Sequence, residues 1–323
     1  MSETEHARSR HGIPPEERPL KDQLKKGIIV MDKPRGPTSH QVSAWVRDMA
    51  GAEKAGHGGT LDPNVSGVLV IALDDALKAL QVLLLDTKEY IATMKLHGQV
   101  SRDELDAVFT EFTAEIYQTP PVRAAVKRER RSRTIYEMEI LDIREKSVLF
   151  RVVCESGTYI RTLCVDMGDA LGVGGHMFEL RRTRTARFGE DQLVTMHELK
   201  DAFVAYEEEG NEAPLRKIIL PFERMLEHLP KVFVKDSAVD AICHGADVAI
   251  PGITKLDGDF TSGQTVAVLT QKGEGIAVGK AKMDSSKMRE MQKGSAVNLE
   301  RVFMAPGTYP QLWKRGKDEK IQG

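Results

Sequence analysis

The chain has 323 residues, of which 41% are hydrophobic and 29% are charged, and its formal net charge at pH 7 is −2. This length suits one large domain or a large and a small one, and the hydrophobic fraction is sufficient for a packed core. A net charge so close to zero neither favours nor excludes a nucleic acid as partner, so that question depends on how the charges are distributed.

Several classes of protein are excluded by what the sequence lacks. The three cysteines, Cys154, Cys164 and Cys243, include no CxxC pair and are too sparse for a disulfide framework, which favours a reducing intracellular compartment. No apolar run reaches the roughly 18 residues of a membrane span, and the polar start has no signal-peptide core. "GEGIAVGKA" has Ala281 where a phosphate-binding loop needs Ser or Thr, and "MHELK" lacks a second His. We therefore expect neither a metal nor a cofactor.

The N-terminal part begins with a polar segment, residues 1–25, which we expect to be disordered or to lie against the surface. "GIIVMDKP" predicts a buried strand that ends at Pro34. "TSHQVSAWVRDMAG" predicts an amphipathic helix that Thr38 or Ser39 can cap and Gly51 can end. "GVLVIAL" predicts a second buried strand.

The middle of the chain contains both helix-type and strand-type patterns of apolar residues. "DDALKALQVLL" predicts an amphipathic helix with Asp74 and Asp75 at its positive end. "EYIATMKLHG" alternates like a strand, with Tyr90 on its apolar face. "SRDELDAVF" begins with the capping-box pair Ser101 and Glu104.

The pattern of apolar residues changes near Pro230. After a strand in "KSVLFRVVCES", a helix is expected from near Thr158 to Gly172. From about Pro230 onward, short apolar runs alternate with Gly- and Asp-rich turns, which predicts a small and mostly β domain, plausibly a barrel.

Asp62 is framed by "AGHGGTLDPNVSGVL", between glycines and a buried strand. Pro63 favours an extended backbone at Asp62, but this motif alone is more typical of a turn aspartate that bonds to its own backbone. Arg161, expected with Tyr159 in the first turn of a helix, offers a cationic partner. Burial raises the pKa of a carboxyl and a nearby arginine lowers it, so such a pair could keep Asp62 ionised.

Two stretches are strongly basic, "RAAVKRERRSR" and "LRRTRTARFG". Such runs are typical of phosphate contacts, although one run alone is equally typical of a solvated charged face. Two of them in a nearly neutral chain favour RNA or DNA as partner.

Taken together, these segments resemble the TruB-type pseudouridine synthases. "GIIVMDKPRGPTSH", "GHGGTLDPNVSGVL", "KEYIATMKLHG", "TPPVRAAVKR", "SGTYIRTLC" and "LRRTRT" occur in the order seen in that family. The chain is most similar to the dyskerin-like branch, the catalytic subunit of H/ACA ribonucleoproteins, in its shorter archaeal form. "HGADVAIPGI" and "RVFMAPGTYP" resemble a PUA domain, a small RNA-binding β-barrel.

The resemblance implies an α+β fold: a large, mixed, mainly antiparallel sheet with flanking helices, followed by a small C-terminal β-barrel. The expected division of the chain is an N-terminal extension (1–25), a catalytic domain (26–229), a PUA domain (230–310) and a polar tail (311–323).

Matched positions imply roles for individual residues. Asp62 corresponds to the catalytic aspartate, Tyr90 to the tyrosine that stacks on the target base, and Arg161 to the arginine that pairs with the aspartate. The other expected pocket residues are Tyr159, a second aromatic, His57, near the displaced nucleotide, and Leu180, in a segment that lines the pocket. Lys33 belongs to a Lys-Pro segment that supports the active-site loop. The residues expected to contact RNA are Lys33, Lys127, Arg128, Arg130, Arg181 and Arg182.

The implied activity is the isomerisation of uridine to pseudouridine in rRNA or tRNA, with the target base flipped out of its stack. The implied partners are substrate RNA, an H/ACA guide RNA and small ribonucleoprotein subunits, and the implied location is the cytoplasm. Two alternatives stay open: a stand-alone tRNA synthase acting on the TψC arm, and a non-catalytic RNA-binding scaffold.

Overall fold

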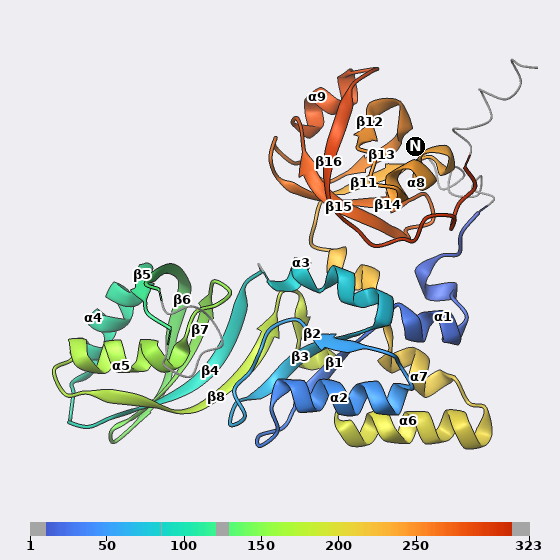
Figure 1. The fold of residues 1–323 in the computed structure, drawn as a ribbon. Coiled ribbons are helices and arrows are strands. Elements are labelled where there is room, and N and C mark those ends of the chain that lie inside the picture. The colour runs from blue at the N-terminus through green and yellow to red at the C-terminus, as the bar shows by residue number, and fades with distance from the viewer. Residues whose placement is uncertain (1–10, 85, 121–128, 312–323) are drawn as a thin grey trace, which may run out of the picture.

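The computed structural model describes residues 11–84, 86–120 and 129–311, which form a large lobe and a smaller one (Figure 1). The central sheet of the large lobe runs in the order β10-β1-β3-β8-β4-β7-β6-β5. Every pairing in it is antiparallel except that of β3 with β8. The expected α+β class, with a mixed and mainly antiparallel sheet, is confirmed. The strands are β1 (Gly27–Lys33), β2 (Ala55–His57), β3 (Ser66–Leu73), β4 (Lys88–Leu96), β5 (Glu115–Gln118), β6 (Arg131–Arg144), β7 (Ser147–Cys154), β8 (Gly175–Thr185), β9 (Phe188–Gly189) and β10 (Leu220–Pro221).

Strands that are buried on both faces have continuous apolar runs, whereas strands that are more buried on one face alternate. In β1, Ile28 and Val30 face one apolar cluster while Ile29 and Met31 face another, so this strand has no solvent face and reads as a continuous apolar run. In β4, buried and half-buried residues alternate along the whole strand. The alternation predicted for β4 and the buried strands predicted for β1 and β3 are confirmed.

Helices cover both faces of the large sheet and are also present in the small lobe. The capping boxes at Thr38 and Ser101 are both formed, and Gly51 ends α2 in the left-handed conformation, as expected. The helices are α1 (Leu20–Lys25), α2 (Ser39–Ala50), α3 (Leu80–Leu84), α4 (Arg102–Phe112), α5 (Ile160–Ala170), α6 (Met196–Glu209), α7 (Ala213–Ile218), α8 (Asp236–Cys243) and α9 (Ser285–Glu290). Among the helices of the described residues, none has the length and apolar character that crossing a bilayer requires.

Two helix predictions need correction. Residues 74–84 do not form one amphipathic α-helix: Asp74–Ala79 is a 3-10 helix, and only Leu80–Leu84 is α-helical. The three-residue period of the first part places Ala76 and Ala79 on one side, where both are fully buried. Tyr159 is the N-cap of α5 rather than part of its first turn. Other short 3-10 helices are η2 (Pro15–Glu17), η4 (Glu190–Gln192), η5 (Phe222–Leu226) and η6 (Ile250–Gly252).

The small lobe is built on a second sheet, in the order β12-β16-β15-β14-β11-β13. Its two outermost strands, β12 and β13, are separated in the chain only by the three residues of η6. The sheet must therefore curl until its edges approach each other, which gives the small lobe its barrel-like form (Figure 1). The strands are β11 (Lys231–Val234), β12 (Val248–Ala249), β13 (Ile253–Asp257), β14 (Thr265–Thr270), β15 (Gly275–Ala281) and β16 (Ser295–Val302).

The N-terminal segment contacts both lobes. Of the two alternatives expected for residues 1–25, disorder is therefore wrong for residues 11–25, which lie against the rest of the protein. Arg18, 4% exposed, pairs with Glu223 of the large lobe, and Glu223 also accepts a hydrogen bond from the Gly275 amide of the small lobe. Lys272 of the small lobe donates to the Gly12 carbonyl at 2.8 Å. This segment is ordered because its polar groups find buried partners in both lobes.

The buried pair makes a first prediction. Replacing Arg18 by Met should lower the free energy of unfolding by about 3 kcal/mol, because Glu223 then stays buried without its cation. The measurement is urea denaturation followed by circular dichroism. The control is Arg47→Met, which breaks an exposed pair with Asp48 and should change stability by less than about 0.5 kcal/mol. Equal losses in the two variants would contradict the assignment.

Candidate active site

Asp62 lies in the loop that precedes β3, and its carboxylate forms an ion pair with the guanidinium of Arg161 on α5. The two residues are 99 positions apart in the chain, so the expected pairing is present in the structure. About half of each side chain is exposed, 51% for Asp62 and 45% for Arg161. The carboxylate is therefore held by a cation and still accessible from solvent.

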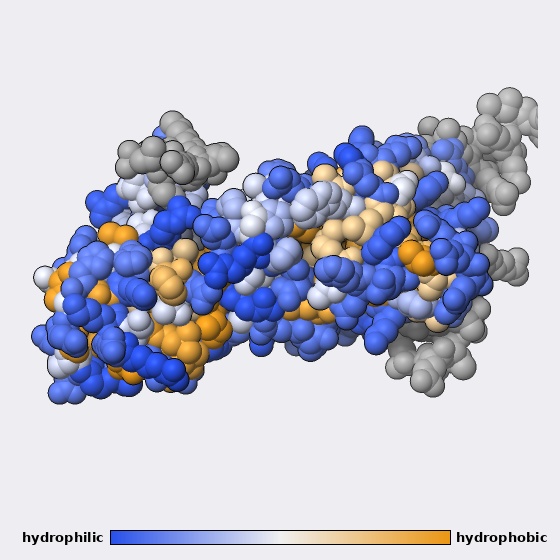
Figure 2. Space-filling model, turned by 90° about the horizontal axis from the view of Figure 1, so that it is seen from below, coloured by the Kyte–Doolittle hydropathy of each residue, from blue (hydrophilic) through white to orange (hydrophobic). Residues whose placement is uncertain are grey.

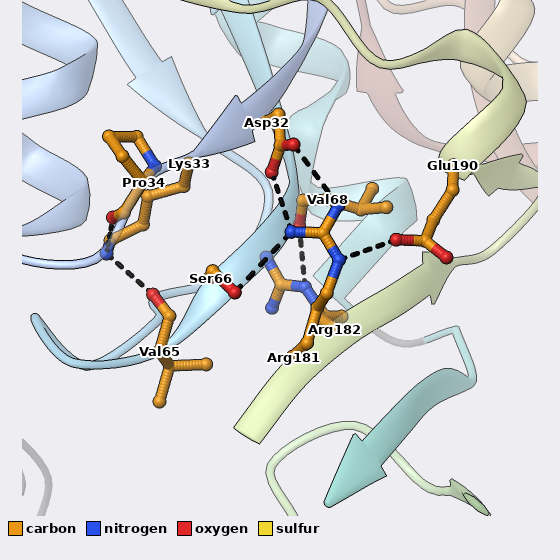
Figure 3. A network of polar contacts seen from close by, with 9 residues as sticks. All are labelled: Asp32, Lys33, Pro34, Val65, Ser66, Val68, Arg181, Arg182 and Glu190. Atoms are coloured by element: carbon orange, nitrogen blue, oxygen red, sulfur yellow. Dashed lines mark hydrogen bonds and ion pairs between the residues drawn. The ribbon is translucent and has the colours of Figure 1, made fainter. Parts of the chain in front are cut away.

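The backbone of this loop is fixed from below by a buried lysine. The Nζ of Lys33 donates to the carbonyls of Pro34, Pro63 and Val65 at 2.9, 3.1 and 2.7 Å, and Figure 3 shows two of these bonds. The side chain has no exposed surface, and burial lowers the pKa of its ammonium. The prediction that Lys33 contacts RNA is wrong, because all three of its donors are already used inside the protein.

Three further hydrogen bonds hold the backbone on either side of Asp62. The hydroxyl of Ser39, the first residue of α2, donates to the Leu61 carbonyl at 3.0 Å and accepts from the Leu61 amide at 2.8 Å. The Gly36 amide donates to the Pro63 carbonyl at 2.8 Å. Asp62 thus sits between two residues whose backbones are pinned, which restricts the positions its carboxylate can reach.

A row of residues across four strands forms the floor of the site. Lys33 on β1 lies opposite Gly67 on β3, which lies opposite Arg182 on β8, which lies opposite Tyr90 on β4. Gly67 has a φ of +103°, and a Cβ there would be 2.1 Å from the Arg182 carbonyl oxygen. Only glycine therefore lets β3 and β8 approach closely enough to form this row.

Arg182 is the centre of this row. Its guanidinium donates to the carbonyls of Val68 at 2.7 Å and Gly59 at 3.1 Å, and it interacts with the phenol of Tyr90. It is 1% exposed, so the prediction that Arg182 contacts RNA is also wrong. Burial raises the pKa of the Tyr90 phenol, and the neighbouring Arg182 charge opposes that rise. Arg182 links the loop before Asp62 to the tyrosine expected under the target base.

The other basic residues have different surroundings. Arg181 pairs with Asp32 at 3.0 Å and with Glu190 at 2.6 Å, and about a third of its side chain is exposed (Figure 3). Arg181 on β8 is therefore neutralised by an acid on β1 and another in η4. The two ion pairs connect these three elements. Arg130 stacks on the Tyr117 ring, with its guanidinium carbon 4.7 Å from the ring centre. Lys127 and Arg128 lie outside the described residues.

The remaining pocket residues lie around this floor. Tyr90, 8% exposed, belongs to one apolar cluster with Leu61 and Val65, the neighbours of Asp62, and Leu180 packs against that cluster. Tyr159 is half-buried, and both its backbone amide and its carbonyl bond to the side chain of Gln118.

His57 is at the end of β2, with its ring 4.9 Å from that of His40 on α2. Burial lowers the pKa of His57 to about 4, so it is neutral at physiological pH. Both of its ring nitrogens are buried, and neither bonds to a described residue.

Sequence reasoning missed three residues of this arrangement. It treated Ser39 only as a possible helix cap, and it did not single out Gln118 or His40. No local signal distinguishes them, because each acquires its role from a segment distant in the chain. Within residues 11–84, 86–120 and 129–311, no group of three or more His, Cys, Asp or Glu side chains is placed to hold a metal ion.

The Lys33 contacts make a second prediction. Lys33→Met should lower the free energy of unfolding by at least about 2 kcal/mol, because buried carbonyls lose their donor. It should also accelerate hydrogen exchange at the Val65 amide, which bonds to the Asp62 carbonyl. Lys78→Met, at an exposed lysine, serves as control and should change neither quantity. Unchanged exchange at Val65 would show that Lys33 does not hold the loop.

Comparison with known families covers almost the whole chain. Residues 47–104 and 96–160 match the TruB family pseudouridylate synthase N-terminal domain, 161–227 the tRNA pseudouridylate synthase B C-terminal domain, 230–303 the PUA domain, and 1–43 the DKCLD (NUC011) domain. A protein of Methanopyrus kandleri named "Probable tRNA pseudouridine synthase B" is 53% identical over 304 residues, which are 94% of this chain and 90% of that protein. Its counterpart in Methanocaldococcus jannaschii is 53% identical over 307 residues, with 95% and 91% covered.

Solved structures agree with these matches. A chain in a Cbf5-Nop10-Gar1 complex is 52% identical, with a TM-score of 0.87 and coverage of 93% of this chain and 92% of that one. A chain in an H/ACA RNP bound to a substrate RNA containing 2′-deoxyuridine is 51% identical, with a TM-score of 0.86 and coverage of 94% and 93%. The resemblance that the motifs indicated is thereby confirmed, and this chain belongs to the TruB/dyskerin-type pseudouridine synthases with a C-terminal PUA domain.

Proposed function

We propose that this pseudouridine synthase uses Asp62 as its reacting carboxylate and takes its target uridines from a guide RNA. The observation that carries the first part is the Asp62–Arg161 pair, which is exposed although the loop around it is fixed by buried donors. A carboxylate that attacks or deprotonates a bound nucleotide must be ionised, accessible and held in place.

The reaction itself is an isomerisation. The N1–C1′ bond of uridine breaks, the uracil turns, a C5–C1′ bond forms, the C5 proton leaves and N1 takes up a proton. Arg161 pairs with the Asp62 carboxylate and orients it, and Tyr90 and Tyr159 offer aromatic surface to a base that has left its stack. We assign Leu180 and His57 to the walls of the same pocket.

The proposal that a guide RNA selects the target uridines is supported by the structures in which similar chains occur. One contains Nop10 and Gar1, and another is an H/ACA RNP with substrate RNA. We propose that this chain likewise works with a guide RNA and small protein subunits, in the cytoplasm. Figure 2 shows hydrophobic side chains on one face of the large lobe, at the end that carries α4 and α5. Phe178 on β8, an exposed aromatic residue of this part of the chain, would offer a protein partner apolar surface.

A stand-alone activity on tRNA is the second candidate, favoured by the name "Probable tRNA pseudouridine synthase B" that the similar proteins carry. The two candidates differ in what turnover requires. Tritium release from C5-labelled uridine in RNA, measured with and without guide RNA and partner subunits, separates them. Release from naked tRNA at the full rate would overturn the guide-dependent reading.

The same assay makes a third prediction, for Asp62. Asp62→Asn should lower tritium release by about 1000-fold or more, because the amide can neither attack nor accept a proton as the carboxylate does. Affinity for the RNA should stay within about tenfold, or roughly 1.4 kcal/mol. Wild-type release by this variant would refute the assignment, and a larger loss of affinity would show that Asp62 is structural.

A fourth prediction concerns the residue that pins Leu61. Ser39→Ala should lower turnover by roughly 10- to 100-fold with little change in RNA affinity, because the Asp62 loop then shifts. The matched control is Ser43→Ala: Ser43 is buried one turn later in α2, and its hydroxyl donates to the Ser39 carbonyl. Both variants should lose about 1 to 2 kcal/mol of stability, but only Ser39→Ala should slow the reaction. Equal effects on turnover would mean that the helix, rather than the Leu61 contact, matters.

A further inference from the structure

A buried glutamine holds the residue at which α5 begins. Gln118, the last residue of β5, is 2% exposed, and its side chain reaches Tyr159, 41 positions further along the chain. Its Oε1 accepts a hydrogen bond from the Tyr159 amide at 2.9 Å, and its Nε2 donates to the Tyr159 carbonyl at 3.1 Å. One side chain thus bonds to both backbone groups of a single residue, as a neighbouring antiparallel strand would.

The start of α5 lacks the usual means of fixing a helix end. Tyr159 is its N-cap, and the side chain of this residue makes no capping hydrogen bond. The first N–H groups of a helix have no intrahelical partner, so a first turn without a cap is prone to fray. Arg161, which pairs with Asp62, lies in that turn. Gln118 is therefore placed to hold the turn from which Arg161 reaches the carboxylate.

The neighbouring contacts fix other parts of α5. The buried face of the helix packs into the same apolar cluster as Tyr90, which limits rotation of the helix about its axis. The residues before the helix form a turn in which the Thr158 amide and hydroxyl both donate to the Glu155 carbonyl. Tyr159 is extended between turn and helix, with φ −97° and ψ 101°, and its amide bonds to Gln118 rather than to either element.

Gln118 is itself held by the central sheet. All four residues of β5 pair with β6, and Gln118 lies opposite Arg131 in that pairing. β6 in turn pairs with β7, so the glutamine is fixed to the sheet on which the floor of the site is built. Its side chain therefore transfers the position of the sheet to the first residue of α5.

We propose that Gln118 is a positioning residue of the synthase, which fixes the start of α5 so that Arg161 meets Asp62 in the geometry that turnover requires. The proposal rests on the proposed function, because the position of Arg161 matters only if Asp62 reacts. A misplacement of about 1 Å can cost roughly 100-fold in rate. Glutamine suits this position because its amide offers one acceptor and one donor side by side.

The first arm of the test compares two buried glutamines. Gln118→Met keeps the length of the side chain and removes both hydrogen bonds to Tyr159. The matched control is Gln23→Met, which removes the bond that buried Gln23 donates to the Ile219 carbonyl, away from Asp62. In the tritium assay with guide RNA and subunits, kcat of Gln118→Met should fall roughly 10- to 100-fold, while KM stays within about threefold.

The control variant should keep both kinetic constants. Equal kcat for the two variants, or a raised KM with unchanged kcat for Gln118→Met, would overturn the proposal. Circular dichroism checks that each variant is folded. If Gln118→Met is not folded, Gln118→Asn takes its place: it retains a buried amide, but it is one methylene too short to reach both groups of Tyr159 and should show the same loss of kcat.

The second arm tests whether Gln118 acts through Arg161. Single-turnover tritium release is measured for Gln118→Met in the wild-type chain and in an Arg161→Lys chain. Once Arg161 has been changed, replacing Gln118 should cost less than about threefold, because residues that act through one contact are not additive. Losses of equal size in the two chains would overturn the proposal.

Asp62→Asn, measured in the same series, separates the two possible failures. Wild-type release by Asp62→Asn would refute the proposed function itself. Loss of release in Asp62→Asn, together with normal turnover by Gln118→Met, would refute only the positioning role of Gln118.

Discussion

The site depends on two buried cations that donate to backbone carbonyls of the strand and loop around Asp62. Lys33 and Arg182 have almost no exposed surface, and each bonds to carbonyls of the segment from Gly59 to Val68. A buried ammonium or guanidinium is costly unless its donors are satisfied, and here carbonyls satisfy them without a carboxylate. The loop cannot move away without leaving a charge unsolvated. This coupling stabilises the conformation of the loop.

Such a frame resolves the conflicting demands on Asp62. A reacting carboxylate must be reachable by a nucleotide, and about half of the Asp62 side chain is exposed. Exposed loops are usually mobile, which would cost the alignment that catalysis needs. Here the fixed parts are the backbone groups of Leu61, Pro63 and Val65, which are pinned from below. The side chain of Asp62 extends into solvent, where Arg161 restricts it.

Local patterns predicted the elements that carry the site but not the contacts between them. The apolar runs of β1 and β3 and the caps of α2 and α4 could be anticipated in this way. The pairing of Asp62 with Arg161 followed from the family resemblance. The burial of Arg182 could not be anticipated, because it depends on the parallel pairing of β3 with β8, strands more than 100 residues apart. The burial of Lys33 could not either, because two of its carbonyl acceptors lie in a loop about 30 residues further along the chain. The same holds for Arg181, whose acid Asp32 is 149 positions away. A basic run therefore predicts charge, while only the fold shows where that charge is neutralised.

The strands that frame Asp62 also carry the second lobe. Ile28 and Val68, on β1 and β3, share one apolar cluster with Ala267, Leu269 and other residues of the small sheet. The contact is reinforced at its edge, where one carboxylate accepts from both the N-terminal segment and the small lobe. Because this cluster lies on one face of the strands that form the floor of the site, a rotation of the small lobe would open the core behind that floor. The small lobe is thus positioned relative to Asp62 through packed side chains rather than through a flexible linker.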